Sequence, residues 1–151
     1  MILIQPKKDV IAIALFVVTS AVWFVRCGSQ EDSPIKIQSA RRAYKLLVGD
    51  SMQHQKLTPF NPETHVVLDL RIDGISTDDF NNADKDSKSV TANGGIFRPN
   101  ITTSGIKGGK KIIRLCVIIP KEKQELTVHI GSFPPKRFRV KGEIYDELKD
   151  W

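Results

Sequence analysis

The sequence predicts a mainly β protein with a transmembrane helix at its N-terminus. An uncharged apolar run extends from Val10 to Val25, between Lys7-Lys8-Asp9 and Arg26. Beyond residue 64, apolar and polar residues alternate with a period of two, which is typical of strands buried on one face. Glycine and proline separate these alternating stretches. We therefore expect a membrane helix, one amphipathic helix, and then a small antiparallel β sandwich or curled sheet of five to six strands.

The apolar run at residues 10–26 is predicted to anchor the chain in a bilayer. A helix built from it has apolar side chains on every side and no polar face to offer to water. Its sixteen uncharged residues would span roughly 24 Å, and the flanking lysines and arginine can snorkel over the remaining thickness. Two aromatic residues near its end are suited to the membrane interface. The residues expected to contact lipid are Val10, Ile13, Phe16, Val17, Trp23 and Phe24.

A cleaved secretory signal and a buried core helix are the alternatives for this run. Cleavage requires small residues just after the apolar core, whereas this core ends in Trp23-Phe24-Val25-Arg26. With a membrane helix at residues 10–26, residues 1–9 form a short N-terminal tail and residues 27–34 form a polar connector. The nearest flanking lysines favour a cytoplasmic N-terminus and an extracytoplasmic C-terminal domain, while the basic residues farther along the chain favour the reverse.

Residues 35–52 are predicted to form an amphipathic helix. Ile37, Ala40, Tyr44 and Leu47 follow one another at spacings of three, four and three residues, which places them on one helical face. Gly49 would end the helix. The basic residues would lie on the opposite face, exposed either to solvent or to lipid headgroups.

Residues 53–151 are predicted to form the β domain. Its most apolar strand is Lys111–Pro120, which we expect in the centre of a sheet with both faces covered. A strand at residues 125–133 is the simplest hairpin partner for it. The other expected elements are an irregular segment at 53–63, a strand at 65–72 with one buried face, a long polar loop at 74–95, an edge strand at 96–103, a strand at 136–144 and a helical turn at 145–151.

No pattern in the sequence predicts an enzyme, a cofactor or a metal. The acidic segment 78–88 contains Asn82, Asp84 and Asp86 at alternate positions, as a calcium loop would, but Ser87 stands where the sharp turn needs glycine. We interpret it as a solvated loop. His65 and His129 could meet only if their strands pair. Hydrolase, phosphate-loop and dinucleotide-binding motifs are absent from the sequence.

The candidate partner contact is a cationic row formed by Arg137, Arg139 and Lys141. Residues two apart on a strand project from the same face at intervals of about 7 Å. We expect Lys110, Lys111 and Arg114 to lie near this row across the sheet. The alternatives to a protein contact are that the row is an ordinary solvated face or that it binds phosphates. The net charge of +6, or +4 beyond the anchor, comes without dense basic clusters, so nucleic acid is an unlikely partner.

These features predict a non-enzymatic, single-pass structural subunit of a large membrane-associated assembly. A bacterial envelope machine and a membrane-containing virion are two such settings, and in the second the β domain would lie between membrane and capsid. The expected partners are the lipid bilayer and protein subunits of the assembly. The alternative is a membrane-tethered module that binds a soluble ligand or an anionic lipid.

Overall fold

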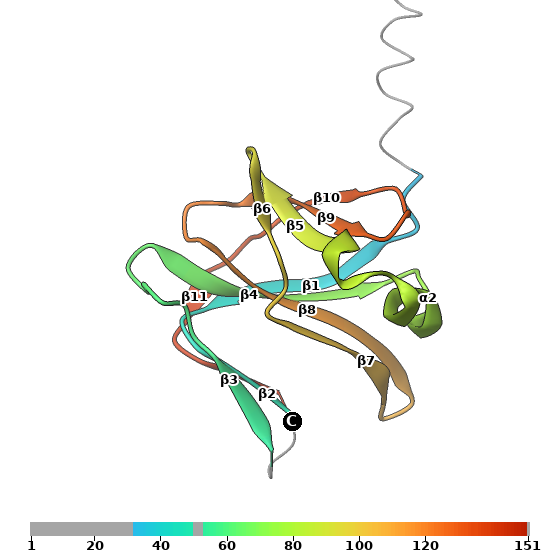
Figure 1. The fold of residues 1–151 in the computed structure, drawn as a ribbon. Helices are drawn as coiled ribbons and strands as arrows, with labels where there is room; N and C mark the ends of the chain where they lie inside the picture. Colours follow the sequence, from blue (N-terminus) through green and yellow to red (C-terminus); the bar gives the residue numbers. More distant parts are fainter. Residues whose placement is uncertain (1–31, 50–52, 151) are drawn as a thin grey trace, which may run out of the picture. The chain divides into compact units, whose positions relative to one another are not determined.

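The computed structural model describes residues 32–49 and 53–150, and these form a mainly β domain with three sheets (Figure 1). The mainly β prediction is confirmed. The predicted membrane anchor at residues 10–26, the tail before it and most of the connector after it lie outside the described residues. Within the described part, no helix is both long and apolar enough to cross a membrane.

The two larger sheets pack face to face as a sandwich. We call the first the large sheet, with strand order β11-β1-β4-β8-β7, and the other the second sheet, with order β10-β9-β5-β6. The large sheet contains β1 (Lys36–Ala43), β4 (His65–Asp73), β7 (Ile101–Lys107), β8 (Lys110–Pro120) and β11 (Ile144–Tyr145). The second sheet contains β5 (Lys88–Ala92), β6 (Gly95–Phe97), β9 (Glu125–Ile130) and β10 (Lys136–Arg139).

The strand order is that of immunoglobulin-type sandwiches. The β1-β4-β8-β7 and β10-β9-β5 sets correspond to the ABED and GFC sheets, and β6 adds one strand beside C. All neighbours in these two sets pair in the antiparallel sense. This likeness concerns topology only, since such sandwiches serve many functions.

The main core lies between the two larger sheets. Alternate residues of β4 and β8 point into it and meet the alternate residues of β5 and β9. Each fully buried aliphatic side chain contributes about 1.5–3 kcal/mol relative to exposure. The strand residues at the centre of this core are Val66, Leu68, Leu70, Ile72, Val90, Ile113, Leu115, Val117, Ile119, Leu126, Val128 and Ile130.

A small sheet covers part of the opposite, outer face of the large sheet. Its order is β12-β2-β3, with β2 at Leu46–Gly49, β3 at His54–Leu57 and β12 at Leu148–Asp150. Its apolar side chains pack on Val67 and Cys116 of the large sheet. The predicted single buried face of residues 65–72 is therefore wrong, because the small sheet also buries the second face of β4. The predicted double coverage of residues 111–120 is confirmed.

The predicted amphipathic helix at 35–52 is wrong, because residues 36–49 form β1 and β2. The register between β1 and β4 shifts between Ile37 and Ser39, so Gln38 is an extra residue in β1. Ile37 and Ala40 consequently face the same core at a spacing of three, which imitates a helical period. The bulge in β1, rather than a helix, explains the spacing that the sequence shows.

The predicted polar loop at 74–95 instead contains regular structure. It includes α2 (Thr77–Asn82), the 3₁₀ turn η1 (Lys85–Ser87) and β5. Ser76 caps α2, and its Oγ accepts a hydrogen bond from the Asp79 N–H at 2.9 Å. Phe80 is buried in the main core and fixes α2 against the sandwich. A few buried apolar residues are therefore enough to give segment 74–95 regular structure, although its polar composition is typical of a loop.

Four further predictions are wrong, and they concern the pairing of β9, the C-terminal segment, segment 53–63 and the number of strands. Strand β9 does not form a hairpin with β8, because β8 pairs with β4 and β7 while β9 belongs to the second sheet. The turn after Pro120 carries the chain from one layer to the other.

The C-terminal segment is not a helical turn, since it forms β11 and β12, which pair in parallel with β1 and β2. Segment 53–63 includes β3, and the described residues form twelve strands rather than five or six.

We expect Phe80→Ala to lower the free energy of unfolding by about 3–5 kcal/mol, because it removes a large buried side chain and leaves a cavity beneath α2. The matched control is Phe60→Ala at a fully exposed phenylalanine, for which the expected change is below about 0.5 kcal/mol. Urea denaturation of the full chain in nonionic detergent, followed by circular dichroism, measures both. Equal effects of the two substitutions would contradict the structural role of α2.

Candidate functional site

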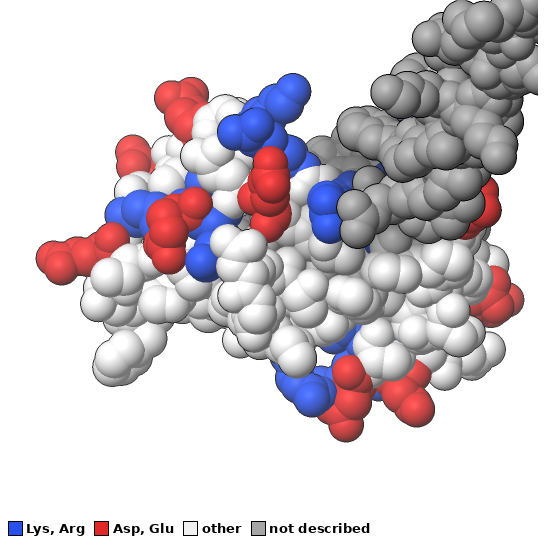
Figure 2. All heavy atoms as spheres, turned by 90° about the horizontal axis from the view of Figure 1, so that it is seen from above, with Lys and Arg blue, Asp and Glu red and all other residues white. Residues whose placement is uncertain are grey.

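The predicted cationic row is only partly assembled. Arg137 and Arg139 are exposed on β10, the outer strand of the second sheet, and Lys141 is exposed beyond the end of that strand. Arg139 lies opposite Glu125 of β9. Figure 2 shows the face uppermost in Figure 1, where basic and acidic side chains are mixed at one end and again along one side of a broad uncharged area. This face therefore does not present a uniform cationic patch.

The other basic residues expected near this row lie elsewhere. Lys110, Lys111 and Arg114 belong to β8 of the large sheet, in the opposite layer of the sandwich. The prediction that they lie close to Arg137 is therefore wrong. Its cause is the assignment of β8 and β10 to one sheet, which the structure divides between two.

Strand β7 is the longest outer strand in the described part of the chain. It pairs with β8 on one side, and no described strand pairs with its other side. Most of its residues are exposed, including Ile106 at 78%. Proteins commonly protect such edges with proline, inward-pointing charges or bulges. Strand β7 contains no proline, and its one charged residue is Lys107 at its end.

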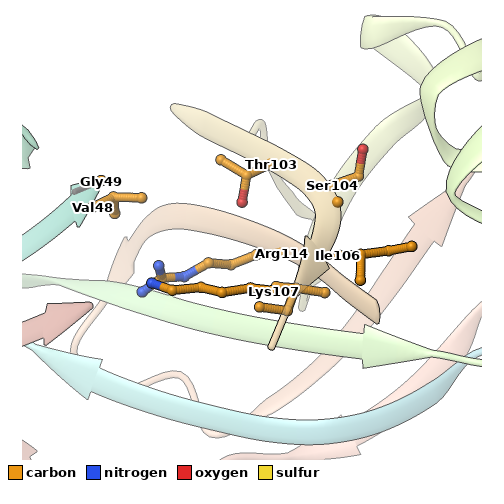
Figure 3. A pocket seen from close by; sticks show the side chains of 9 residues that line it. Val48, Gly49, Thr103, Ser104, Ile106, Lys107 and Arg114 are labelled. Carbon is orange, nitrogen blue, oxygen red and sulfur yellow. The ribbon is translucent and has the colours of Figure 1, made fainter. Parts of the chain in front are cut away.

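A pocket of about 210 Å³ adjoins β7 on the outer face of the large sheet. One side of it comes from β7 and β8, and the other from Val48 and Gly49 at the tip of β2. Figure 3 shows that the charged ends of Lys107 and Arg114 point toward the same side of the pocket, near β2. The pocket combines two cationic side chains with the hydroxyl group of Thr103. The Ser104 hydroxyl instead donates to Oδ1 of Asn81 at 2.5 Å.

A buried ion pair holds Arg114 in position. The Nε of Arg114 donates to Oδ1 of Asp69 at 2.5 Å, and Nη2 of Arg41 donates to Oδ2 of Asp69 at 2.8 Å. The side chain of Asp69 is fully buried, and that of Arg114 is 2% exposed. Charged groups taken out of water need both opposite charge and hydrogen bonds. Arg114 is therefore a fixed cation at the floor of the pocket rather than a mobile surface side chain.

Asp73 is a second carboxylate of β4 and lies at the end of that strand. The backbone N–H of Gly74 donates to it at 2.7 Å, and Nε2 of Gln38 donates at 3.3 Å. The Gly74 hydrogen bond is the largest cause that lowers the pKa of Asp73, with smaller contributions from Gln38, Lys111 and Lys36. Asp73 therefore stays ionised to lower pH than an ordinary aspartate.

The residues considered for metal binding are not brought together. In the described part of the chain, no group of three or more His, Cys, Asp or Glu side chains could hold a metal ion. Asp86 pairs with Arg98. His65 lies on β4 and His129 on β9, in different sheets, and His129 instead contacts Thr91 Oγ1 at 3.0 Å.

The pocket residues Lys107 and Arg114 were not predicted as one site. The available signal was a charged residue within the apolar part of each of two strands, Arg114 in β8 and Asp69 in β4. Such residues need a partner when the strand is buried on both faces. The sequence does not show that these two strands are neighbours.

Comparisons of the chain with protein-family models, with curated proteins and with solved structures find no match. We therefore infer the function from the residues of the site.

Asp69→Asn is expected to lower the free energy of unfolding by about 3–5 kcal/mol, because it leaves a buried guanidinium group without its counter-charge. Asp73→Asn removes a carboxylate from the same strand at a partly exposed position, and we expect a much smaller loss of stability because solvent screens this charge. Urea titration of both variants, with wild type alongside, measures the difference. Similar midpoints for the two variants would show that the buried pair does not determine stability.

Proposed function

We propose that the protein is a non-enzymatic, single-pass membrane-anchored structural subunit of a large membrane-associated assembly, and that its β domain docks on a neighbouring protein through β7. The uncharged run at residues 10–25 supports the membrane anchor. The observation that carries the docking proposal is the exposed seven-residue edge strand.

An edge strand binds an extended segment by adding it to the sheet. In an antiparallel pair, the backbone N–H and C=O groups that do not face the partner point away from it and can accept a further strand. Each backbone hydrogen bond contributes about 0.5–1.5 kcal/mol net. Ile106 adds exposed apolar surface, which strand addition would bury. Strand β7 therefore supplies both the polar and the apolar interactions that docking needs.

The short connector suits a subunit that works close to the bilayer. The domain begins at Ser33, whose Oγ donates to the Pro134 carbonyl oxygen at 2.6 Å, at the turn between β9 and β10. Arg26, the end of the predicted anchor, precedes Ser33 by seven residues, which span at most about 25 Å. A tether of this length raises the effective concentration of the domain for partners at the same membrane. We place the domain on the extracytoplasmic side, as the lysines before the anchor favour.

The pocket supports a second candidate, a membrane-tethered module that binds a small anionic ligand. Its two cations would attract such a ligand. Its volume of about 210 Å³ is nevertheless small, since pockets for drug-sized ligands occupy about 300–1,000 Å³. The pocket is better matched to one side chain of a docked protein, so we prefer the docking function.

Substitution Ile106→Lys tests the docking proposal. A lysine on an edge strand opposes strand addition, and the exposure of Ile106 leaves room for it without disturbing the core. We expect the variant to leave the large membrane complex, with a loss of about tenfold in the cosedimenting fraction, which corresponds to about 1.4 kcal/mol. The measurement is sucrose-gradient sedimentation after gentle detergent extraction from native membranes.

The matched control is Ile96→Lys, because Ile96 is also an exposed isoleucine on an outer strand, β6 of the second sheet. This variant is expected to cosediment as the wild type does. If both variants remain in the complex, and reversal of Arg137, Arg139 and Lys141 to glutamate releases the protein, docking occurs through the cationic row and not through β7. A wild-type protein that sediments as a monomer would contradict the assembly proposal as a whole.

A further inference from the structure

We propose that the pocket beside β7 receives an acidic side chain of the segment that adds to this strand. The docking partner would then be a protein with an extended segment that carries carboxylates at alternate positions. The biological role of this contact rests on the proposed docking function, whereas the binding of an acidic strand can be measured independently of it.

The register of the large sheet places the pocket where an added strand would put a side chain. Thr103 pairs with Arg114, and Gly105 pairs with Ile112, so these four residues share the outer face. Lys107, two residues after Gly105, shares this face and also lines the pocket. A strand added beside β7 projects every second side chain from the same face, at intervals of about 7 Å. One of those side chains would therefore lie next to the pocket.

Gly105 leaves open space in this part of the pocket. A Cβ atom built on Gly105 would meet no atom within 4 Å. The backbone of Gly105 does not adopt the left-handed conformation that favours glycine. A side chain of a docked segment can thus approach the backbone of β7 closely at this position.

The chemistry of the pocket selects a carboxylate. Arg114 is oriented by its bond to Asp69, and Lys107 forms no ion pair with any described residue. Hydrogen bonds between such cations and a carboxylate are charge-assisted and therefore stronger than those between neutral groups. The Thr103 hydroxyl can donate a further hydrogen bond. An uncharged side chain such as glutamine would form only the weaker hydrogen bonds of a neutral acceptor.

A protein segment fits this site better than a lipid headgroup. The pocket is small, and Val48 and Ile112 give it apolar walls. The adjoining edge of β7 offers backbone hydrogen-bonding groups in a row, which a polypeptide can match and a headgroup cannot. The two features together specify both the extended backbone and the acidic side chain of the occupant.

Fluorescence anisotropy with the full chain in nonionic detergent tests the proposal. The probe is a fluorescein-labelled, end-blocked peptide of eight residues in which valine and glutamate alternate, and its control contains glutamine in place of glutamate. We expect the glutamate peptide to bind at least about tenfold more tightly, and Lys107→Glu to weaken its binding by about tenfold or more. Gly105→Leu, which fills the open space, is expected to abolish the preference for glutamate.

The matched control is Lys110→Glu, which makes the same charge change at the residue paired with Lys107 but outside the pocket. We expect a smaller loss than for Lys107→Glu, because Lys110 does not line the pocket and can interact with a bound carboxylate only through solvent. Equal losses in Lys107→Glu and Lys110→Glu would overturn the proposal in favour of general electrostatic attraction. Equal binding of the glutamate and glutamine peptides would overturn the pocket's role while leaving strand addition intact.

Two further outcomes separate this inference from the docking function. If neither peptide binds, yet Ile106→Lys still releases the protein from its complex, the acidic-segment proposal fails and the docking function stands. If the full chain in nonionic detergent binds phosphatidylglycerol supplied in mixed micelles, Lys107→Glu abolishes this binding, and no peptide binds, then the pocket recognises a headgroup and the proposal is also overturned. Circular dichroism of each variant establishes that it is folded.

Discussion

Asp69 and Arg114 form an ion pair on the outer face of the large sheet, close to the tip of the small sheet. Because both side chains are almost fully excluded from water, the pair depends on close geometry and on the second hydrogen bond from Arg41. The apolar side chains of β2 and β12 pack on the same face of the large sheet, on Val67 and Cys116. The same pair orients the cation at the floor of the pocket, so stability and the candidate site share one interaction.

The two edges of the large sheet differ in whether other described strands lie beside them. At one edge, β11 pairs with β1, and the chain continues into β12 beside β2. Lys45 and Lys149 bind Glu147 between these two strands, and their hydrogen bonds lower the pKa of this carboxylate. At the other edge, β7 has no described neighbour on its outer side. A long open edge is an aggregation hazard in a monomer, which supports its use as an interface.

An edge and a pocket make different contributions to recognition. Backbone pairing along β7 would be largely independent of the partner's sequence, since every residue except proline offers the same groups. The adjoining pocket, with Lys107 and Arg114, would distinguish an acidic segment from a neutral one. A membrane tether would add affinity without adding any contact, because it confines domain and partner to one surface.

The amino-acid pattern by itself determined the β class and the strands at 65–72 and 111–120. The predicted strands at 96–103 and 136–144 are each divided in the structure, the first into β6 and β7 and the second into β10 and β11, and the two parts of each lie in different sheets. The alternation of apolar and polar residues along a strand indicates which side chains are buried. Proline marks positions that cannot donate a backbone hydrogen bond to a neighbouring strand. Tertiary structure alone decided the bulge at Gln38, the division of β8 and β9 between two sheets, and the meeting of Lys107 with Arg114 in one pocket. These features depend on which strands become neighbours. The apolar periodicity of a single strand does not indicate which other strand it will pair with.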